Sequence, residues 1–314
     1  MTQTVRNRVL LAKVESSYGV DPTPVVATDA IEVRNLSYKA LGDLLERDNV
    51  RSNISATSPV VGKRWAEITF DAELKGSGTK GTAGALSDLL QACSFAETVS
   101  AGSSVTYAPT SSSQKSATFY VYNNDTSSAV LQKITGAVGT FTLKLTAGEY
   151  GVLSFTFRGM YNAPTDVALP TTPTFETTTP PTVQSAAFTI NSVSSLIIQE
   201  VNIDIANTLA EHESVNATNG LSGFFVSERK PKGSFNPEAT LLATYDYFTD
   251  WASSTSRALS VVIGSVNGNK CTITAPAVTI DSLSDADRNS LLAKDIPISF
   301  GQSSGNDEIQ FKFE

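Results

Sequence analysis

Residues 44–74 read LLERDNVRSNISATSPVVGKRWAEITFDAEL, and a related pattern returns without a gap at residues 209–239, LAEHESVNATNGLSGFFVSERKPKGSFNPEA. At this offset of 165 positions, identical residues form the pairs Leu44/Leu209, Glu46/Glu211, Val50/Val215, Val61/Val226, Arg64/Arg229, Phe70/Phe235 and Glu73/Glu238. Average composition gives roughly two identities in such a window. The interval far exceeds the ~20 to 50 residues of solenoid repeats, so the pattern predicts two similar domains in tandem.

Length and composition agree with that prediction. A chain of 314 residues accommodates about two domains, and its 40% hydrophobic and 17% charged residues leave a composition rich in Ser, Thr, Val and Gly. Such a composition favours β-structure. A net charge of -8 argues against a protein that grips nucleic acid, although it allows nucleic acid to pass. We expect neither a membrane span nor a signal peptide, and we expect Cys93 and Cys271 to be buried free thiols.

Domain boundaries follow from a segment rich in Pro and Thr, APTDVALPTTPTFETTTPPT, at residues 163–182. Proline fixes φ and removes backbone donors, so this segment is expected to be extended and outside any central strand. The predicted organisation is a first domain at residues 1–163 with its N-terminal arm, a linker at 164–184 and a second domain at 185–314.

Alternation of apolar and polar residues predicts the strands. In residues 65–74 it places Glu67, Asp71 and Glu73 on one wet face, and in the second half it does the same for Glu200 and Asp204. Further strands are expected at residues 117–122, 140–145, 151–158, 259–263, 271–274, 296–300 and 309–313. Helical spacing predicts helices at residues 83–95 and 238–252. A third is expected after Ser284, where Asp285 and Asp287 suit a first turn before Leu291 and Leu292. The fold class is mainly β: two β-sandwich domains, each with one flanking α-helix.

Two long connections, residues 42–63 and 207–232, separate the first strands of each half. Ordered domains rarely keep connections of this length without a use for them. Each is either a solvated flexible loop or an arm that reaches a neighbouring subunit. The charged residues that we assign to such inter-subunit or inter-ring contacts are Glu46, Arg47, Asp48, Arg51, Glu211, Glu213, Arg229 and Lys230.

No motif predicts catalysis. Residues 76–81 match G-x-G-x-x-G, but residues 96–114 are predicted to form a loop, whereas a dinucleotide site needs a second parallel strand there. The single histidine, His212, lies among charged residues, and no nucleophile elbow is present. We therefore expect a protein that is not an enzyme and has no cofactor and no metal.

One segment resembles a known family. Residues 10–33, LLAKVESSYGVDPTPVVATDAIEV, contain a K-x-E-x-x-Y-G-x-D-P pattern carried by Lys13, Glu15, Tyr18, Gly19, Asp21 and Pro22. This pattern is similar to the N-terminus of the major tail proteins, or tail tube proteins, of long-tailed, non-contractile (siphovirus-type) bacteriophages. A looser likeness extends over the whole chain.

The resemblance implies two tail-tube-type domains in a structural virion protein. Such proteins stack as rings around a continuous inner barrel, and a duplicated chain implies three subunits in a pseudo-sixfold ring through which DNA reaches the host cell. The implied partners are other copies of the chain, the tape measure protein, the tail terminator, distal tail or baseplate proteins and DNA in transit, with no membrane. The implied location is the virion tail, after synthesis in the host cytoplasm.

An acidic lumen would repel phosphates, so Glu67, Asp71, Glu73, Glu200 and Asp204 are the candidates for its wall. Alternatives remain open. These acids could face the outside or a ring interface. The chain could instead be a secreted or surface two-domain immunoglobulin-like adhesin, or an enzyme that binds a nucleotide at residues 76–81.

Overall fold

The computed structural model describes residues 6–123, 129–169 and 172–314. As the composition predicts, the protein is mainly β, with only two short helices in the described residues, α1 (Ser87–Ala92) and α2 (Tyr247–Ala252). None of the helices in these residues has the length and apolar character needed to cross a membrane.

The first half is built on six antiparallel strands. Their spatial order is β1 (Arg8–Val14), β7 (Ala117–Asn123), β8 (Val130–Thr146), β9 (Val152–Tyr161), β4 (Val60–Glu73) and β3 (Arg34–Leu45). Four short strands add to this framework: β2 (Ala30–Ile31), the hairpin β5 (Phe95–Ser100) and β6 (Ser104–Pro109), and β10 (Thr165–Asp166).

The second half repeats that spatial order. Its strands are β11 (Ala187–Ile190), β16 (Arg257–Ile263), β17 (Cys271–Ile280), β19 (Leu291–Gly301), β15 (Lys232–Pro237) and β12 (Ile198–Asp204). The remaining strands are the hairpin β13 (Asn207–Glu213) and β14 (Leu221–Arg229), then β18 (Ser284–Arg288) and β20 (Gln310–Phe313).

Strand register repeats as well. Ser37 pairs with Thr69 in the first half, and Asn202, 165 positions later, pairs with Ser234. The break in register between Ala117 and Phe119 recurs between Arg257 and Leu259 at the corresponding strand pair. Because β-bulges re-aim a strand at defined positions, their recurrence means that the two halves share fine geometry as well as strand order.

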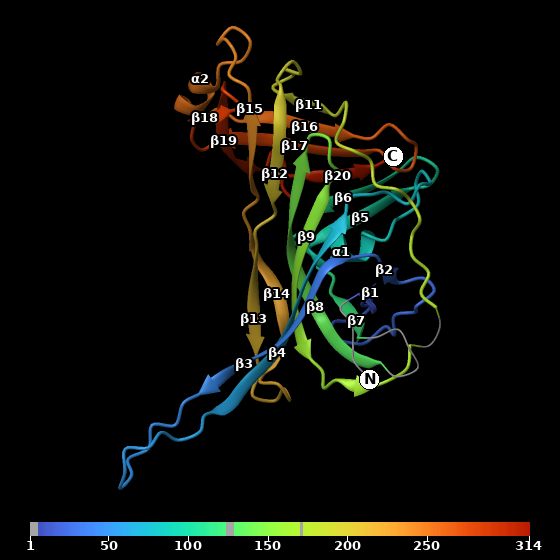
Figure 1. Cartoon of the computed structure of the whole chain (residues 1–314), viewed down its shortest axis with the longest axis vertical. Helices are drawn as coiled ribbons and strands as arrows, with labels where there is room; N and C mark the ends of the chain where they lie inside the picture. The colour runs from blue at the N-terminus through green and yellow to red at the C-terminus, as the bar shows by residue number, and fades with distance from the viewer. Residues whose placement is uncertain (1–5, 124–128, 170–171) are drawn as a thin grey trace.

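The two halves join edge to edge. The C-terminal end of β8 pairs with β12, from Thr142 opposite Asp204 to Thr146 opposite Glu200. One continuous sheet therefore runs through β3, β4, β9, β8, β12, β15 and β19 (Figure 1). The halves also share a core, because the rings of Phe95, Phe141 and Phe311 lie 5.7 Å from one another across the junction.

Three sequence expectations were wrong in detail. Residues after Ser284 form strand β18 and a hairpin, because Asn289 and Ser290 both take positive φ in a two-residue turn and Leu291 and Leu292 stay exposed. The predicted helices at 83–95 and 238–252 are reduced to α1 and α2. In the second of these, Leu241 and Leu242 face solvent, so no apolar stripe drives a longer helix.

Connections that were expected to be loops are largely strands. Residues 95–109 form the β5–β6 hairpin, and most of 207–232 belongs to β13, β14 and β15, whereas in 42–63 only the two ends belong to β3 and β4 and residues 46–59 connect them. The predicted linker contributes β10 and then extends along the first half, where Val183 donates its N–H to the carbonyl of Glu149. Its residues 170–171 lie outside the described part of the chain.

Candidate assembly surfaces

All five acids predicted for one wet face lie on the same side of the continuous sheet. We call this side, opposite the core, the polar sheet face; it is built from β3, β4, β9, β8, β12 and β15. Glu67, Asp71 and Glu73 alternate along β4 with fully buried apolar residues, and Glu200 and Asp204 alternate with buried Val201 and Ile203 along β12. Strict alternation over a sheet with one buried face makes this placement obligatory.

Cations neutralise most of these acids. Glu67 lies 3.4 Å from Lys39 Nζ and 3.1 Å from Arg158 Nε, and Glu200 lies 2.9 Å from Lys144 Nζ. A hydrogen bond from Asn202 and the neighbouring Lys144 lower the pKa of Glu200. The polar sheet face is therefore a mixed ladder of charges, not a uniformly acidic wall.

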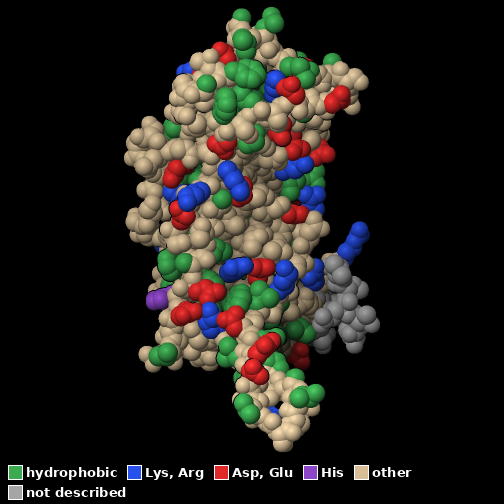
Figure 2. Space-filling model, turned by 90° about the vertical axis from the view of Figure 1, so that its left-hand side faces the viewer, with side chains coloured by type: hydrophobic (Ala, Val, Ile, Leu, Met, Phe, Trp, Pro, Cys, Tyr) green, Lys and Arg blue, Asp and Glu red, His purple; other side chains and the backbone are tan. Residues whose placement is uncertain are grey.

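Pairs of opposite charge occupy matching places in the two halves. Asp204 lies 3.7 Å from Lys232, at the positions that Lys39 and Glu67 occupy in the first half, with the signs exchanged. Figure 2 likewise shows blue and red side chains interspersed on the side of the molecule that it presents, with uncharged surface between them. Asp71 bonds to uncharged groups instead, the side chains of Asn35 and Ser154, each at 2.6 Å.

The β3–β4 hairpin leaves the body of the molecule as an arm (Figure 1). Its tip, residues 46–59, carries four of the predicted contact residues, Glu46, Arg47, Asp48 and Arg51, all exposed. Two apolar side chains on this tip, Val50 and Ile54, are fully exposed. The tip therefore presents both charged and apolar side chains to solvent.

The matching hairpin of the second half, β13–β14, folds back onto the first half. Lys63 on β4 lies 2.8 Å from Glu211 and 2.7 Å from Glu213, and these hydrogen bonds raise the pKa of Lys63. The carbonyl of Asn219 accepts a hydrogen bond from the N–H of Arg64 at 3.1 Å. Glu211 and Glu213 therefore hold the two halves of one chain together.

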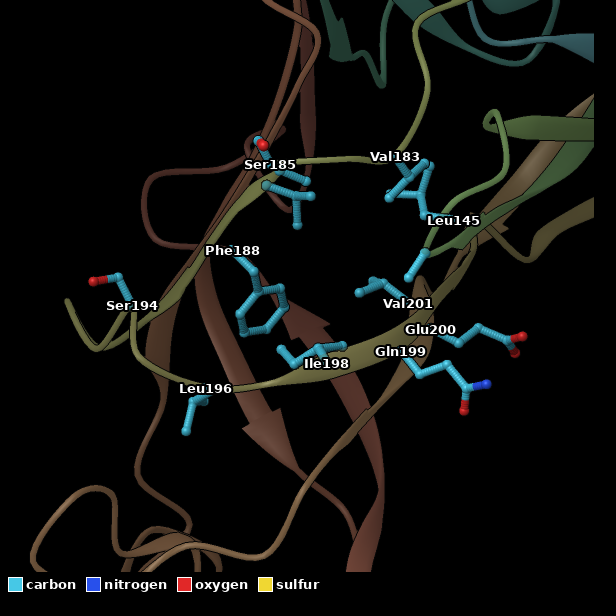
Figure 3. A pocket seen from close by; sticks show the side chains of 13 residues that line it. Leu145, Val183, Ser185, Phe188, Ser194, Leu196, Ile198, Gln199, Glu200 and Val201 are labelled. Carbon is cyan, nitrogen blue, oxygen red and sulfur yellow. The ribbon is translucent and has the colours of Figure 1, made fainter. Parts of the chain in front are cut away.

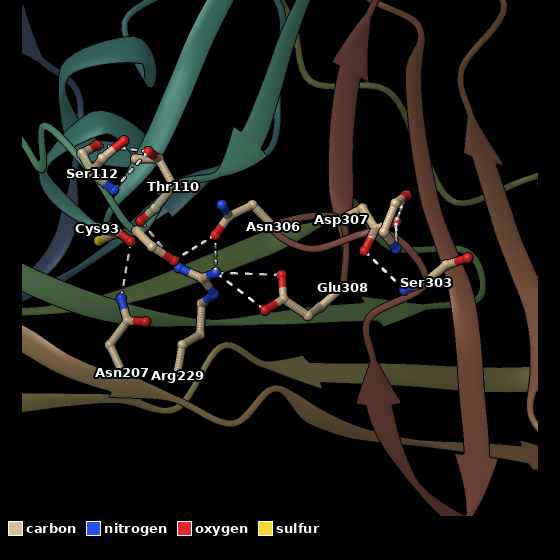
Figure 4. Close-up of polar contacts among 11 residues, drawn as sticks. Cys93, Thr110, Ser112, Asn207, Arg229, Ser303, Asn306, Asp307 and Glu308 are labelled. Carbon is tan, nitrogen blue, oxygen red and sulfur yellow. Dashed lines mark hydrogen bonds and ion pairs between the residues drawn. The ribbon is translucent and has the colours of Figure 1, made fainter.

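Arg229 also bonds within the chain (Figure 4). Its guanidinium lies 3.1 Å from Glu308, 3.3 Å from Asn306 and 3.4 Å from the carbonyl of Thr110, and its side chain is only 8% exposed. These contacts tie β14 to the loop before β20 and to the end of β6. Of the two predicted basic contacts here, Lys230 is the one whose side chain remains exposed.

The N-terminal K-x-E-x-x-Y-G segment is an internal clamp. Glu15 is 3% exposed and accepts hydrogen bonds at 2.6 to 2.7 Å from Gly19 N–H, Ser116 Oγ, Thr118 Oγ1 and Gly136 N–H. Tyr18 Oη then donates to the carbonyl of Gly136 and accepts from the N–H of Phe224 on β14, at 2.8 and 2.6 Å. The segment thus fixes β14 over the first half, a role that the motif alone did not reveal.

The glycine-rich segment 76–81 also serves packing. Gly78 N–H donates to the carbonyl of Gly268, and Gly76 N–H donates to the side chain of Asn269. A Cβ on Gly76 would lie 2.2 Å from the Gly268 oxygen, so glycine is needed for this close backbone approach between the halves. Cys93 and Cys271 are free and buried, as predicted.

A cavity of about 220 Å³ lies beside the junction of the halves (Figure 3). Leu145 from the first half and Phe188, Ile198 and Val201 from the second point into it, whereas Glu200 points away. Its lining is mainly apolar and offers few of the convergent polar groups that orient a small ligand.

The fold and these surfaces define a β-rich protein built for assembly, with a projecting arm and a broad polar face. A family model described as phage tail tube protein matches residues 6–310. The chain belongs to this family, which confirms the resemblance carried by its N-terminal segment. No curated protein matches the chain. Membership makes it a structural component of a phage tail that self-assembles into a tube with other tail proteins.

Proposed function

We propose that three copies of this chain close a pseudo-sixfold ring, and that such rings stack into the tube through which phage DNA reaches the host cell. One observation carries the proposal: the two halves share strand order and register and are joined edge to edge by β8 and β12. A chain that is already two matching segments of one sheet needs fewer copies to close a barrel.

The polar sheet face lines the lumen in this arrangement. Its acids, Glu67, Asp71, Glu73, Glu200 and Asp204, alternate with Lys39, Lys144, Arg158 and Lys232 and with many hydroxyl side chains. Cations that are already paired with carboxylates neutralise few phosphates, so the DNA loses few of its condensed counterions and such a wall binds DNA weakly. Weak binding suits a tube through which DNA must slide.

Stacking between rings is assigned to the arm tip, residues 46–59, with its exposed Val50 and Ile54 and its charged Glu46, Arg47, Asp48 and Arg51. The ends of the tube meet a tail terminator and distal tail or baseplate proteins, and a tape measure protein occupies the lumen during assembly. The chain is made in the host cytoplasm of a siphovirus-type phage.

Negative-stain microscopy of the purified chain over a range of concentrations tests this function. Hollow rings or tubes are expected, since closure removes the exposed strand edges that a single copy carries. Dispersed particles the size of one chain at every concentration would contradict the proposal and revive the adhesin alternative.

A further inference from the structure

Residues that are identical in the two repeats differ sharply in exposure. Val226 on β14 is 7% exposed, whereas its counterpart Val61 on β4 is 54% exposed. Leu209 on β13 is half-buried against the cluster of Val138, Leu221 and Phe224, whereas its counterpart Leu44 is 65% exposed. The second-half hairpin lies over the first half, whereas the described residues leave Leu44 and Val61 largely uncovered.

The sheet edges show the same asymmetry. β12 pairs with the end of β8, but its counterpart β3 pairs only with β4 among the described strands, so no described strand pairs with its other edge. At the opposite end of the chain, β18 pairs only with β19 among the same strands. An unpaired edge is a template for another strand.

β18 is the structural counterpart of the end of β8. Gly139 lies opposite Phe157 in β8 and β9, and Ile280 lies opposite Ile298 in β17 and β19. Three positions further along β9 and β19, Ser154 faces Thr142 and Asp295 faces Ser284, with one additional residue between Ile280 and Ser284 in the second half. The unpaired edge of β18 therefore occupies, in the second half, the position at which β8 pairs with β12 in the first half.

Resting on the ring proposed above, we infer that β3 of one copy adds to β18 of a second copy in the register of the internal β12–β8 junction. In that junction Asn202 lies opposite Lys144, which places Ser37 of one copy opposite Ala286 of the next. The stem of the arm, Leu44 and Val61, then packs on the second half of that copy.

Disulfide trapping tests the register. Directly opposed residues on antiparallel strands have Cβ atoms about 4.5 to 5.5 Å apart, close to the range that a disulfide spans. The variant Ser37→Cys/Ala286→Cys is assembled and oxidised, then run on a denaturing gel without reductant. The native thiols are expected to form no disulfide, because Cys93 and Cys271 are completely buried and burial raises the pKa of both.

We expect covalent species that end at the trimer, three times the 33.3 kDa chain. The matched control Ser37→Cys/Ser284→Cys keeps the same strand face but moves one cysteine two residues, and it should cross-link at least tenfold less. Tubes that form but cross-link through position 284, or through neither pair, would overturn this register while leaving the tube function intact. Absence of rings and tubes in the unaltered chain would instead refute the function itself.

The arm stem supplies a second measurement. Leu44→Ser/Val61→Ser should raise the concentration needed for assembly at least tenfold while leaving the melting temperature of the unassembled chain within a degree or two, because both side chains are exposed there. Val266→Ser, on a valine that is 67% exposed in the turn between β16 and β17, is the control. If the unaltered chain, the double variant and the control all assembled at the same concentration, the docking of the stem would be contradicted.

Discussion

Replacing Glu15 by Gln removes one carboxylate oxygen from the clamp while keeping its shape. Each oxygen of Glu15 accepts from one backbone N–H and one hydroxyl: Oε1 from Gly136 and Thr118, Oε2 from Gly19 and Ser116. Whichever oxygen becomes the NH₂ group, the hydroxyl can rotate and accept, but the backbone N–H loses its partner.

The expected loss of stability is about 3 kcal/mol. An unsatisfied buried N–H costs about 1 to 3 kcal/mol, and the remaining bonds lose the extra strength that a charged acceptor gives them. Urea unfolding of the unassembled chain at neutral pH should show this loss. Glu32→Gln is the control, since Glu32 is exposed and has only a 3.4 Å contact with Lys75. A loss below about 0.5 kcal/mol for Glu15→Gln would refute the clamp.

Three further predictions concern the hairpins and the helix. Replacing residues 46–59 by a two-residue turn should leave single rings but abolish stacking, and tubes of normal length in electron micrographs would count against the arm. Gly223→Ala should lower stability by about 2 to 4 kcal/mol in thermal unfolding, because its Cβ would lie 2.2 Å from Tyr18 Oη; an unchanged melting temperature would be contrary evidence. Burial raises the pKa of Asp88 to about 6 from 3.8, so the folded state binds the proton more tightly and stability falls as pH rises from about 4 to 6. Asp88→Asn should flatten that slope and stabilise the chain at pH 7 by up to about 3 kcal/mol, and an unaltered pH profile would exclude this assignment.

Features that depend on short stretches of sequence could be predicted before the structure. Alternation in residues 65–74 located β4 and its acidic side, and the repeat at an offset of 165 anticipated the common register of β3–β4 and β12–β15. The helix expected after Ser284 was wrong because first-turn acids followed by Leu291 and Leu292 do not show whether a core lies beneath the leucines, and here both leucines face solvent.

Contacts between distant segments could not be predicted in this way. The cations beside Glu67 come from Lys39 and Arg158, and only the pairing of three strands brings them together. The same holds for Tyr18, which reaches β14 across 206 positions of sequence. The polar sheet face was therefore foreseen as acidic, while its neutralisation required the register of the folded sheet.

Cryo-electron microscopy of assembled tubes tests the central claim most directly. We expect three chains in each ring, with the two halves of each chain occupying alternate positions of a pseudo-sixfold barrel whose lumen is lined by the polar sheet face. Six complete chains in a ring, or a lumen lined by any other surface of the chain, would contradict this account.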